Sequence, residues 1–191
     1  MKRIGLRILT ALTLAAVPVL ALPMTADAAG ASPPSPYCGI TWGSLDKGAD
    51  GMAPSPGGSI SNVRSGAHPC YDRLVVDITG GLRGYNIRYV PQVLSEGKGD
   101  VVPTAGGARL AISVFAPAYA LDGTWTYAPS DPSHLVNVTG YRTFRQVTWG
   151  GSFEGYTTIG LGVRARLPFR VFMLPGPGTG SRLVIDVAHR W

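Results

Sequence analysis

Short runs in which apolar residues occupy every second position fill much of the sequence after residue 60, and they constrain the fold more than any other feature. Apolar side chains at every second position place one face of an extended strand in a core and the other face toward solvent. The clearest runs are 85–89, 108–116, 159–163 and 169–173. In the third run Thr158, Gly160 and Gly162 alternate with the apolar positions, so we expect them on the outer face.

Turn-forming residues separate these runs. Glycine and proline favour turns and interrupt strands, and about seven or eight short strands divided in this way predict an all-β sandwich or barrel. The turn signals are Gly80-Gly81, 97–100, Gly106-Gly107, Asp131-Pro132, Gly150-Gly151 and 175–178.

One sequence pattern occurs twice. The segment 72–78, DRLVVDI, is matched by the segment 181–187, SRLVIDV. Two copies are too few for a repeat architecture. We expect two strands with equivalent places in the two packed sheets, each with its Leu, Val or Ile face inward and an Arg, Val, Asp face outward.

The first 28 residues have the order of a secretory signal peptide. Lys2, Arg3 and Arg7 precede an apolar run from Ile8 to Leu22, which ends near the small residues 26–29. The run is shorter than the roughly 20 residues that a membrane-spanning helix needs. We therefore expect cleavage after Ala28, a secreted or wall-associated protein, and no transmembrane anchor after processing.

The exported chain then divides into two parts. Residues 29–62 are a linker and N-terminal segment rich in proline, glycine and serine, and residues 63–191 form the β domain. Between two linker-like stretches, the short apolar segment 38–44 is expected to dock on the domain as an edge strand.

The two cysteines, Cys38 and Cys70, predict a disulfide, because exported chains meet an oxidising environment. This bond would tether the N-terminal segment to the domain. A metal site formed by these cysteines with His68 and either His134 or His189 is the alternative, but the spacing is not that of paired zinc ligands. We expect neither a metal nor a cofactor.

Positive charge is concentrated in the last part of the chain, after residue 134. The whole chain has a formal net charge of +6, and removal of the leader leaves 14 basic against 10 acidic residues, or +4. After residue 134 only Glu154 and Asp186 oppose seven arginines, at positions 142, 145, 164, 166, 170, 182 and 190. This bias fits an anionic polymer, and no nucleic-acid-binding motif accompanies it.

Five strand signatures in a fixed order resemble a known family: HPCYDRLVVDITG, GYNIRYV, FEGYTTIGLGV, PFRVF and SRLVIDV. They resemble the AMIN-like domain of secreted actinobacterial proteins, which is related to the AMIN domain that targets periplasmic amidases to the wall. The resemblance implies a β-sandwich of two small sheets and a wall-associated, non-enzymatic role. No amidase domain accompanies the AMIN-like domain in this sequence. We therefore expect the domain itself to bind a component of the envelope or to recruit a partner.

These observations predict a non-catalytic cell-envelope module that binds an anionic or glycan wall component, or an envelope protein. Strand alternation places the side chains of the candidate binding arginines on the outer face of the domain. The candidate aromatic residues lie near turns, where they would stack on sugars or fill the ends of the sandwich. They are Arg164, Arg166, Arg170, Trp125, Tyr127 and Trp149.

Two other functions are the alternatives. A secreted hydrolase would use Asp77 and Asp186 as an acid/base pair, although we expect these aspartates to form ion pairs within the sheet. The G-x-S-x-G and H-E-x-x-H motifs of other hydrolases are missing from the sequence, and we assign no catalytic residue. An inhibitor of an exported enzyme would present a rigid loop, for which residues 117–133 are the best candidate.

Overall fold

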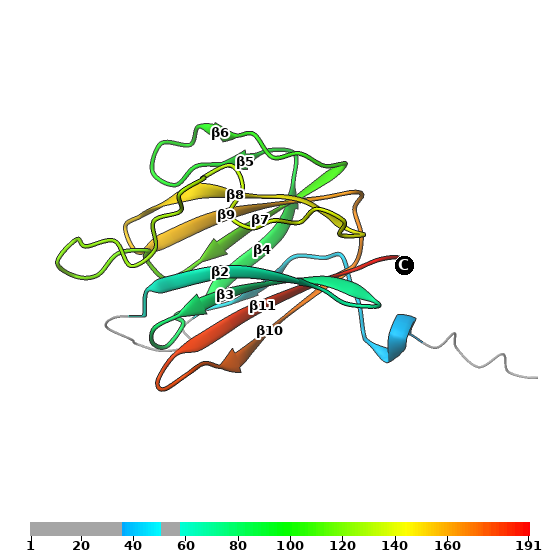
Figure 1. Ribbon diagram of the computed structural model, residues 1–191, viewed down its shortest axis with the longest axis horizontal. Coiled ribbons are helices and arrows are strands. Elements are labelled where there is room, and N and C mark those ends of the chain that lie inside the picture. Colours follow the sequence, from blue (N-terminus) through cyan, green and yellow to red (C-terminus); the bar gives the residue numbers. More distant parts are fainter. Residues whose placement is uncertain (1–35, 51–57) are drawn as a thin grey trace, which may run out of the picture. The chain divides into compact units, whose positions relative to one another are not determined.

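The computed structural model describes residues 36–50 and 58–191, and this part of the chain is all-β (Figure 1). It contains a short 3-10 helix, η1 (Tyr37–Gly39), and two packed antiparallel sheets. The five-stranded sheet has the order β1 (Lys47–Ala49), β4 (Tyr85–Val90), β7 (Ala108–Val114), β9 (Tyr156–Val163), β8 (Phe144–Phe153). The four-stranded sheet has the order β10 (Phe169–Pro175), β11 (Ser181–Ala188), β3 (Tyr71–Ile78), β2 (Ile60–Ala67). The predicted all-β sandwich is confirmed. The leader prediction concerns residues outside the described part.

The core lies between the two sheets and uses the faces that the alternation predicted. Strand β7 contributes Leu110, Ile112 and Val114, none of which is exposed to solvent. The same core receives buried side chains from the other central strands: Leu74, Val76, Ile78, Ile159, Leu161, Val163, Leu183, Ile185 and Val187. Burial of each such side chain stabilises the fold by about 1.5–3 kcal/mol, so the sandwich rests mainly on this alternation.

The two copies of the repeated pattern lie side by side in one sheet, so their predicted assignment to two sheets is wrong. Strands β3 and β11 pair antiparallel, with Arg73 opposite Asp186 and Asp77 opposite Arg182. The reason is that a strand with Arg and Asp four residues apart is complementary to itself when the second copy runs in the opposite direction. Opposite charges then face each other across the strands, which stabilises the pairing.

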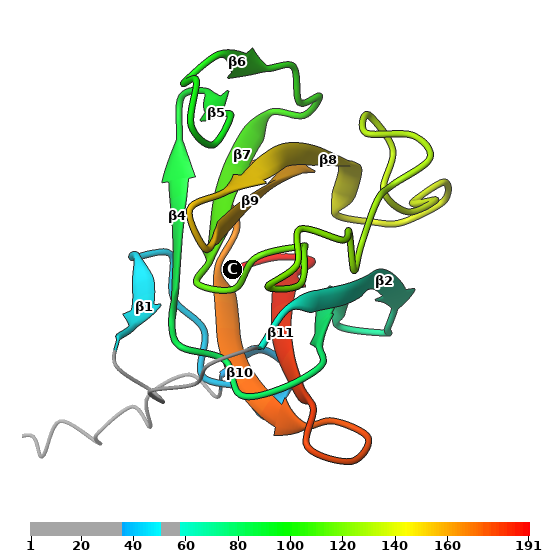
Figure 2. The same cartoon turned by 90° about the vertical axis from the view of Figure 1, so that its left-hand side faces the viewer.

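A third layer covers the outer face of the five-stranded sheet, where solvent was expected. The segment 91–107 crosses this face and forms the small sheet of β5 (Val93–Leu94) and β6 (Val101–Val102), seen above β7 and β8 in Figure 2. Thr158, Gly160 and Gly162 are therefore buried. A side chain at Gly162 would overlap the carbonyl of Ala105, so the glycines on this face allow the close approach of the covering segment.

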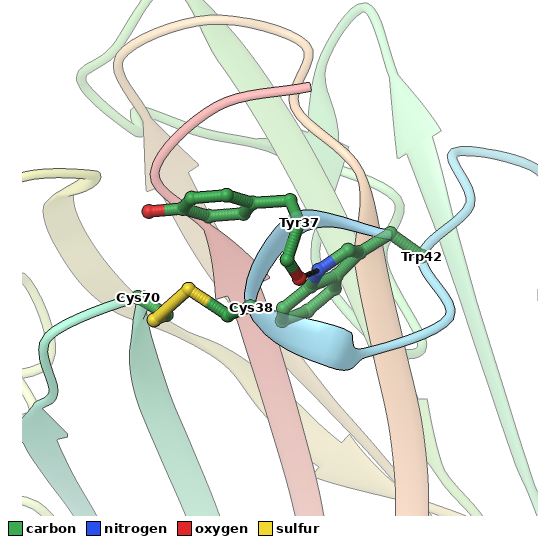
Figure 3. The surroundings of a disulfide bond; sticks show 4 residues. All are labelled: Tyr37, Cys38, Trp42 and Cys70. Carbon is green, nitrogen blue, oxygen red and sulfur yellow. Dashed lines mark hydrogen bonds between the residues drawn. A yellow bond between two sulfur atoms is a disulfide. The ribbon is translucent and has the colours of Figure 1, made fainter. Parts of the chain in front are cut away.

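The N-terminal segment is held by the predicted disulfide, Cys38–Cys70, which is confirmed (Figure 3). The prediction that 38–44 forms an edge strand is wrong: the segment begins with η1 and joins the four-stranded sheet only through the bridge between Gly43 and Phe169. Cys38 has φ 55° and Gly39 has φ 67°, and two left-handed residues in succession end any extended conformation. The edge strand is β1, a few residues later, on β4.

The glycine pair 150–151 lies inside strand β8, where a turn was expected. The register with β9 shifts between Trp149 and Ser152, so the glycines form a bulge there. The chain reverses at Glu154-Gly155 instead, and both of these residues have positive φ. This turn closes the β8–β9 hairpin.

One buried carboxylate links the two sheets to each other. Asp72 lies in β3 and its side chain is fully buried. Its Oδ2 accepts hydrogen bonds from the backbone N–H groups of Thr143 at 2.6 Å and Phe144 at 3.0 Å, at the start of β8 in the other sheet. Its Oδ1 lies 3.1 Å from Nε2 of the buried His189, next to the C-terminus. Three distant segments therefore meet at this carboxylate.

We predict that Asp72→Ala lowers the free energy of unfolding by about 3–5 kcal/mol, because it leaves two buried backbone N–H groups and His189 without their acceptor. Urea denaturation followed by tryptophan fluorescence measures the change. Asp100→Ala is the control, since Asp100 is exposed. If the two variants have the same midpoint, Asp72 does not link the sheets energetically.

Candidate functional site

The outer face of the four-stranded sheet carries a row of charged residues from three neighbouring strands. Asp186 of β11 has Arg170 of β10 on one side and Arg73 of β3 on the other. Arg73 donates from Nε to Oδ1 at 2.6 Å and from Nη2 to Oδ2 at 2.8 Å, while Arg170 donates from Nε to Oδ2 at 2.8 Å. The Asp186 carboxylate is fully buried between the two guanidiniums.

Aromatic rings surround both guanidiniums. The Arg170 guanidinium lies 5.0 Å from the ring centre of Phe172, 5.3 Å from that of Tyr71 and 5.5 Å from that of Trp42. The Arg73 guanidinium lies 5.1 Å from the Tyr71 ring and 5.4 Å from the Phe172 ring. Each distance is within the range of a cation–π interaction. We call Trp42, Tyr71, Arg73, Arg170 and Phe172 the arginine–aromatic face.

The disulfide-tethered segment supplies one ring of this face. Cys38 is bonded to Cys70, next to Tyr71, and Trp42 follows a few residues after Cys38 (Figure 3). The Trp42 indole N–H donates to the carbonyl oxygen of Tyr37 at 2.8 Å, which fixes the orientation of the ring. The bridge from Gly43 to Phe169 then holds the segment beside β10. The disulfide therefore contributes to the site as well as to stability.

The arrangement favours binding of an anion. Two positive charges share one carboxylate, so the row keeps a net positive charge, and the hydrogen bonds that Arg73 donates to Asp186 raise the pKa of Arg73 above its ordinary value. A guanidinium has five N–H donors, and the contacts with Asp186 and the Tyr71 hydroxyl use only part of them. The side chains of Arg73 and Arg170 are 23% and 31% exposed, so they remain accessible to a ligand.

The three predicted arginines do not share one strand face. Only Arg170 lies on the arginine–aromatic face. Arg164 and Arg166 lie in the connection from β9 to β10, where Arg164 donates to the carbonyl oxygen of His189 and Arg166 to that of Ser44 at 3.2 Å. Arg166 also lies 4.8 Å above the ring of Tyr89. Alternation cannot predict their direction because the strand ends at Val163.

The three predicted aromatic residues have different environments. Trp125 is 56% exposed and packs edge-to-face on Tyr119. Tyr127 and Trp149 pack against each other, with ring centres 5.5 Å apart, and both contact the core. Trp149 also lines a hollow of about 600 Å³ beside β6. Only Trp125 is open enough to be a free stacking surface.

Asp77 and Asp186 do not form an acid/base pair. Asp186 is buried between two arginines, and Asp77 pairs with Arg64 at 2.8 Å. Asp77 lies four residues along β3 from Arg73, which is opposite Asp186. At 3.3 Å per residue this is about 13 Å, beyond the separation of glycosidase carboxylates. The expectation that these aspartates form ion pairs within the sheet is confirmed.

Sequence reasoning missed four residues of this face: Trp42, Tyr71, Arg73 and Phe172. A signal for Arg73 was present, because the repeated pattern pairs Arg with Asp when two copies run antiparallel. Phe172 follows Arg170 at the next outward position of β10. No local pattern marks Trp42, since its contact with Arg170 joins segments far apart in the chain.

The described fold and site define a class of protein: a small β-sandwich whose candidate site is a partly exposed face of one sheet. A family comparison matches the AMIN-like domain over residues 58–189. The chain belongs to the AMIN-like domain family. Searches of curated proteins and of solved structures found no match.

Family membership indicates a cell-wall-related module, and the disulfide fits an extracellular location. Strand β2 begins at Ile60, close to the start of the family match and three residues before the domain start expected from the sequence. Within residues 36–50 and 58–191, no helix has both the length and the apolar character needed to cross a membrane.

We predict that Asp186→Asn lowers the free energy of unfolding by about 3–5 kcal/mol, because Arg73 and Arg170 lose their shared counter-charge. Thermal and urea unfolding measure the loss. Arg182→Gln is the control in the same strand: Arg182 is partly exposed and donates to the Pro175 carbonyl oxygen at the end of β10, and its loss costs less than about 1 kcal/mol. Equal losses in the two variants would contradict a structural role for the Arg–Asp–Arg row.

Proposed function

We propose that the protein is a secreted, non-catalytic module of the cell envelope that binds an anionic wall component through the arginine–aromatic face. In this proposal the leader 1–28 directs export and is removed. The observation that carries the proposal is the row in which buried Asp186 holds Arg73 and Arg170 among three aromatic rings. The family assignment supports a role at the wall.

The chemistry of the face fits a polymer with phosphate or carboxylate groups. Guanidinium groups form paired hydrogen bonds with the oxygens of both anions. Because Asp186 fixes both guanidiniums before a ligand arrives, little side-chain freedom is lost on binding. Aromatic rings add contact area against sugar rings of the same polymer. A polymer that alternates sugars and anions would use both kinds of group.

Binding should be mainly electrostatic. The chain after residue 134 is rich in arginine, so the field around the sheet adds to the local contacts. At about 0.15 M salt the Debye length is near 8 Å, and attraction beyond that distance is screened. Binding should therefore weaken as the salt concentration rises past this value.

Co-sedimentation of the processed protein with purified cell-wall sacculi tests the proposal. We predict that Arg170→Gln weakens binding about tenfold, the equivalent of one charge-assisted hydrogen-bonded contact of about 1.4 kcal/mol, and that it keeps the fold because Arg73 still pairs with Asp186. Arg88→Gln removes the same charge from exposed Arg88 on the other sheet and should bind as the parent does.

Two preparations of sacculi identify the anion. Intact sacculi carry attached phosphate polymers, and acid-stripped sacculi retain the carboxylates of the peptidoglycan. Binding lost on stripping assigns the phosphate polymer, and binding retained assigns the peptidoglycan. If Arg170→Gln and Arg88→Gln sediment with sacculi as the parent does, at low and high salt alike, the proposal is wrong.

A further inference from the structure

The end of the sandwich that carries the β8–β9 turn has an exposed apolar surface separate from the arginine–aromatic face. The first part of the β7–β8 loop, residues 117–127, and the β8–β9 turn lie there, and Figure 1 shows this turn at the end opposite the C-terminus. Leu121 is 96% exposed, Trp125 56%, Phe153 51% and Tyr156 44%. We call these four residues and Tyr119 the aromatic end.

Hydrogen bonds and ring contacts hold the two segments of this surface together. The backbone N–H of Gly155 donates to the Tyr119 hydroxyl at 3.2 Å, and that of Ala118 donates to Ser152 Oγ at 2.9 Å. Tyr119 and Trp125 form an isolated β-bridge and pack edge-to-face, with ring centres 6.0 Å apart. The exposed rings are therefore held in place before any partner binds.

The segment that covers the five-stranded sheet supports the same surface. The backbone N–H of Glu96 donates to the Gly150 carbonyl oxygen at 2.8 Å. The Phe153 ring packs on Gly97, which has φ 77°, and an added Cβ there would lie 3.1 Å from Phe153 Cγ. Three segments distant in sequence, 94–101, 117–127 and 150–157, thus form one continuous surface.

The charge of these three segments is opposite to that of the whole chain. They contain four carboxylates and one lysine, a formal charge of 1 − 4 = −3, whereas the chain carries +6. The charged residues are Glu96, Lys98, Asp100, Asp122 and Glu154. The backbone N–H of Thr124 donates to Asp122 at 2.9 Å and lowers its pKa below the ordinary value. The Asp122 carboxylate is therefore ionised, and it lies three residues before Trp125 in the chain.

We infer that the aromatic end docks a protein whose surface has apolar side chains bordered by lysine or arginine. Exposed Trp, Tyr and Phe side chains in fixed positions are typical of protein–protein interfaces. Glu96 accepts a hydrogen bond from Thr158 on the sheet, and the three exposed carboxylates are those of Asp100, Asp122 and Glu154. These three select a cationic partner and repel both an anionic membrane and an anionic wall polymer. The rings pack edge-to-face, with angles of 88° for Tyr119–Trp125 and 71° for Phe115–Tyr156, so beyond the single Trp125 ring they form no continuous flat platform for a sugar chain.

This inference does not rest on the proposed wall binding. With both surfaces in use, the module would hold the wall polymer on its sheet face and a second envelope protein at its distal end. A variant of one surface should leave the other active, so the failure of either proposal is visible separately.

The test places a photoreactive phenylalanine at position 121 or 154 in the full chain, secreted by its native cells. A protein cross-linked from both positions is identified, purified and titrated against the mature module by calorimetry. We expect Leu121→Asp and Trp125→Ala each to weaken binding at least tenfold. We expect Glu154→Lys to weaken it more at low than at high salt, because salt screens the charge.

Two controls separate binding from folding. Leu121 is almost fully exposed, so Leu121→Asp keeps the fold and should still bind sacculi as the parent does. Trp191→Ala removes a tryptophan that is 69% exposed near the C-terminus and should leave the affinity for the captured protein unchanged. The inference is overturned if neither position yields a protein adduct, if only glycan or lipid is labelled, or if Leu121→Asp binds the purified protein normally.

Discussion

The candidate site depends on the two ion pairs that the buried Asp186 carboxylate forms with Arg73 and Arg170. The pairing with Arg73 exists because β3 and β11 carry the same pattern and pair antiparallel, which places the aspartate of one strand opposite the arginine of the other. A buried charge must be paired to be tolerated, and here the pairing fixes two guanidiniums on an outer sheet face. The site is therefore a product of strand register.

The two sheets differ in what their outer faces do. The segment 91–107 covers the five-stranded sheet, whose small outer residues allow its close approach. The four-stranded sheet leaves Arg73 and Arg170 partly exposed on its outer face, and the disulfide-tethered segment adds Trp42 at one edge. Asp72 joins the two sheets through the start of β8. The five-stranded sheet is thus covered on its outer side and packs against the four-stranded sheet, which presents the arginine–aromatic face.

The sequence predicted the parts of the structure that depend on local alternation. Strands β4, β7, β9 and β10 and their inward faces follow from the period of two, and the disulfide follows from a single pair of cysteines. Contacts between distant segments left no such pattern: Trp42 reaches Arg170 across more than half of the chain. The direction of Arg164 and Arg166 was not predictable because alternation ends with the strand.

NMR titration shows directly whether an anionic wall polymer contacts the arginine–aromatic face. The reporters are the Nε–H signals of Arg73 and Arg170 and the indole N–H signal of Trp42, followed as a soluble fragment of the polymer is added. If the polymer binds there, all three signals shift saturably, and high salt reverses the shifts. Saturable binding that leaves these three signals unmoved and shifts others instead would contradict binding at this face.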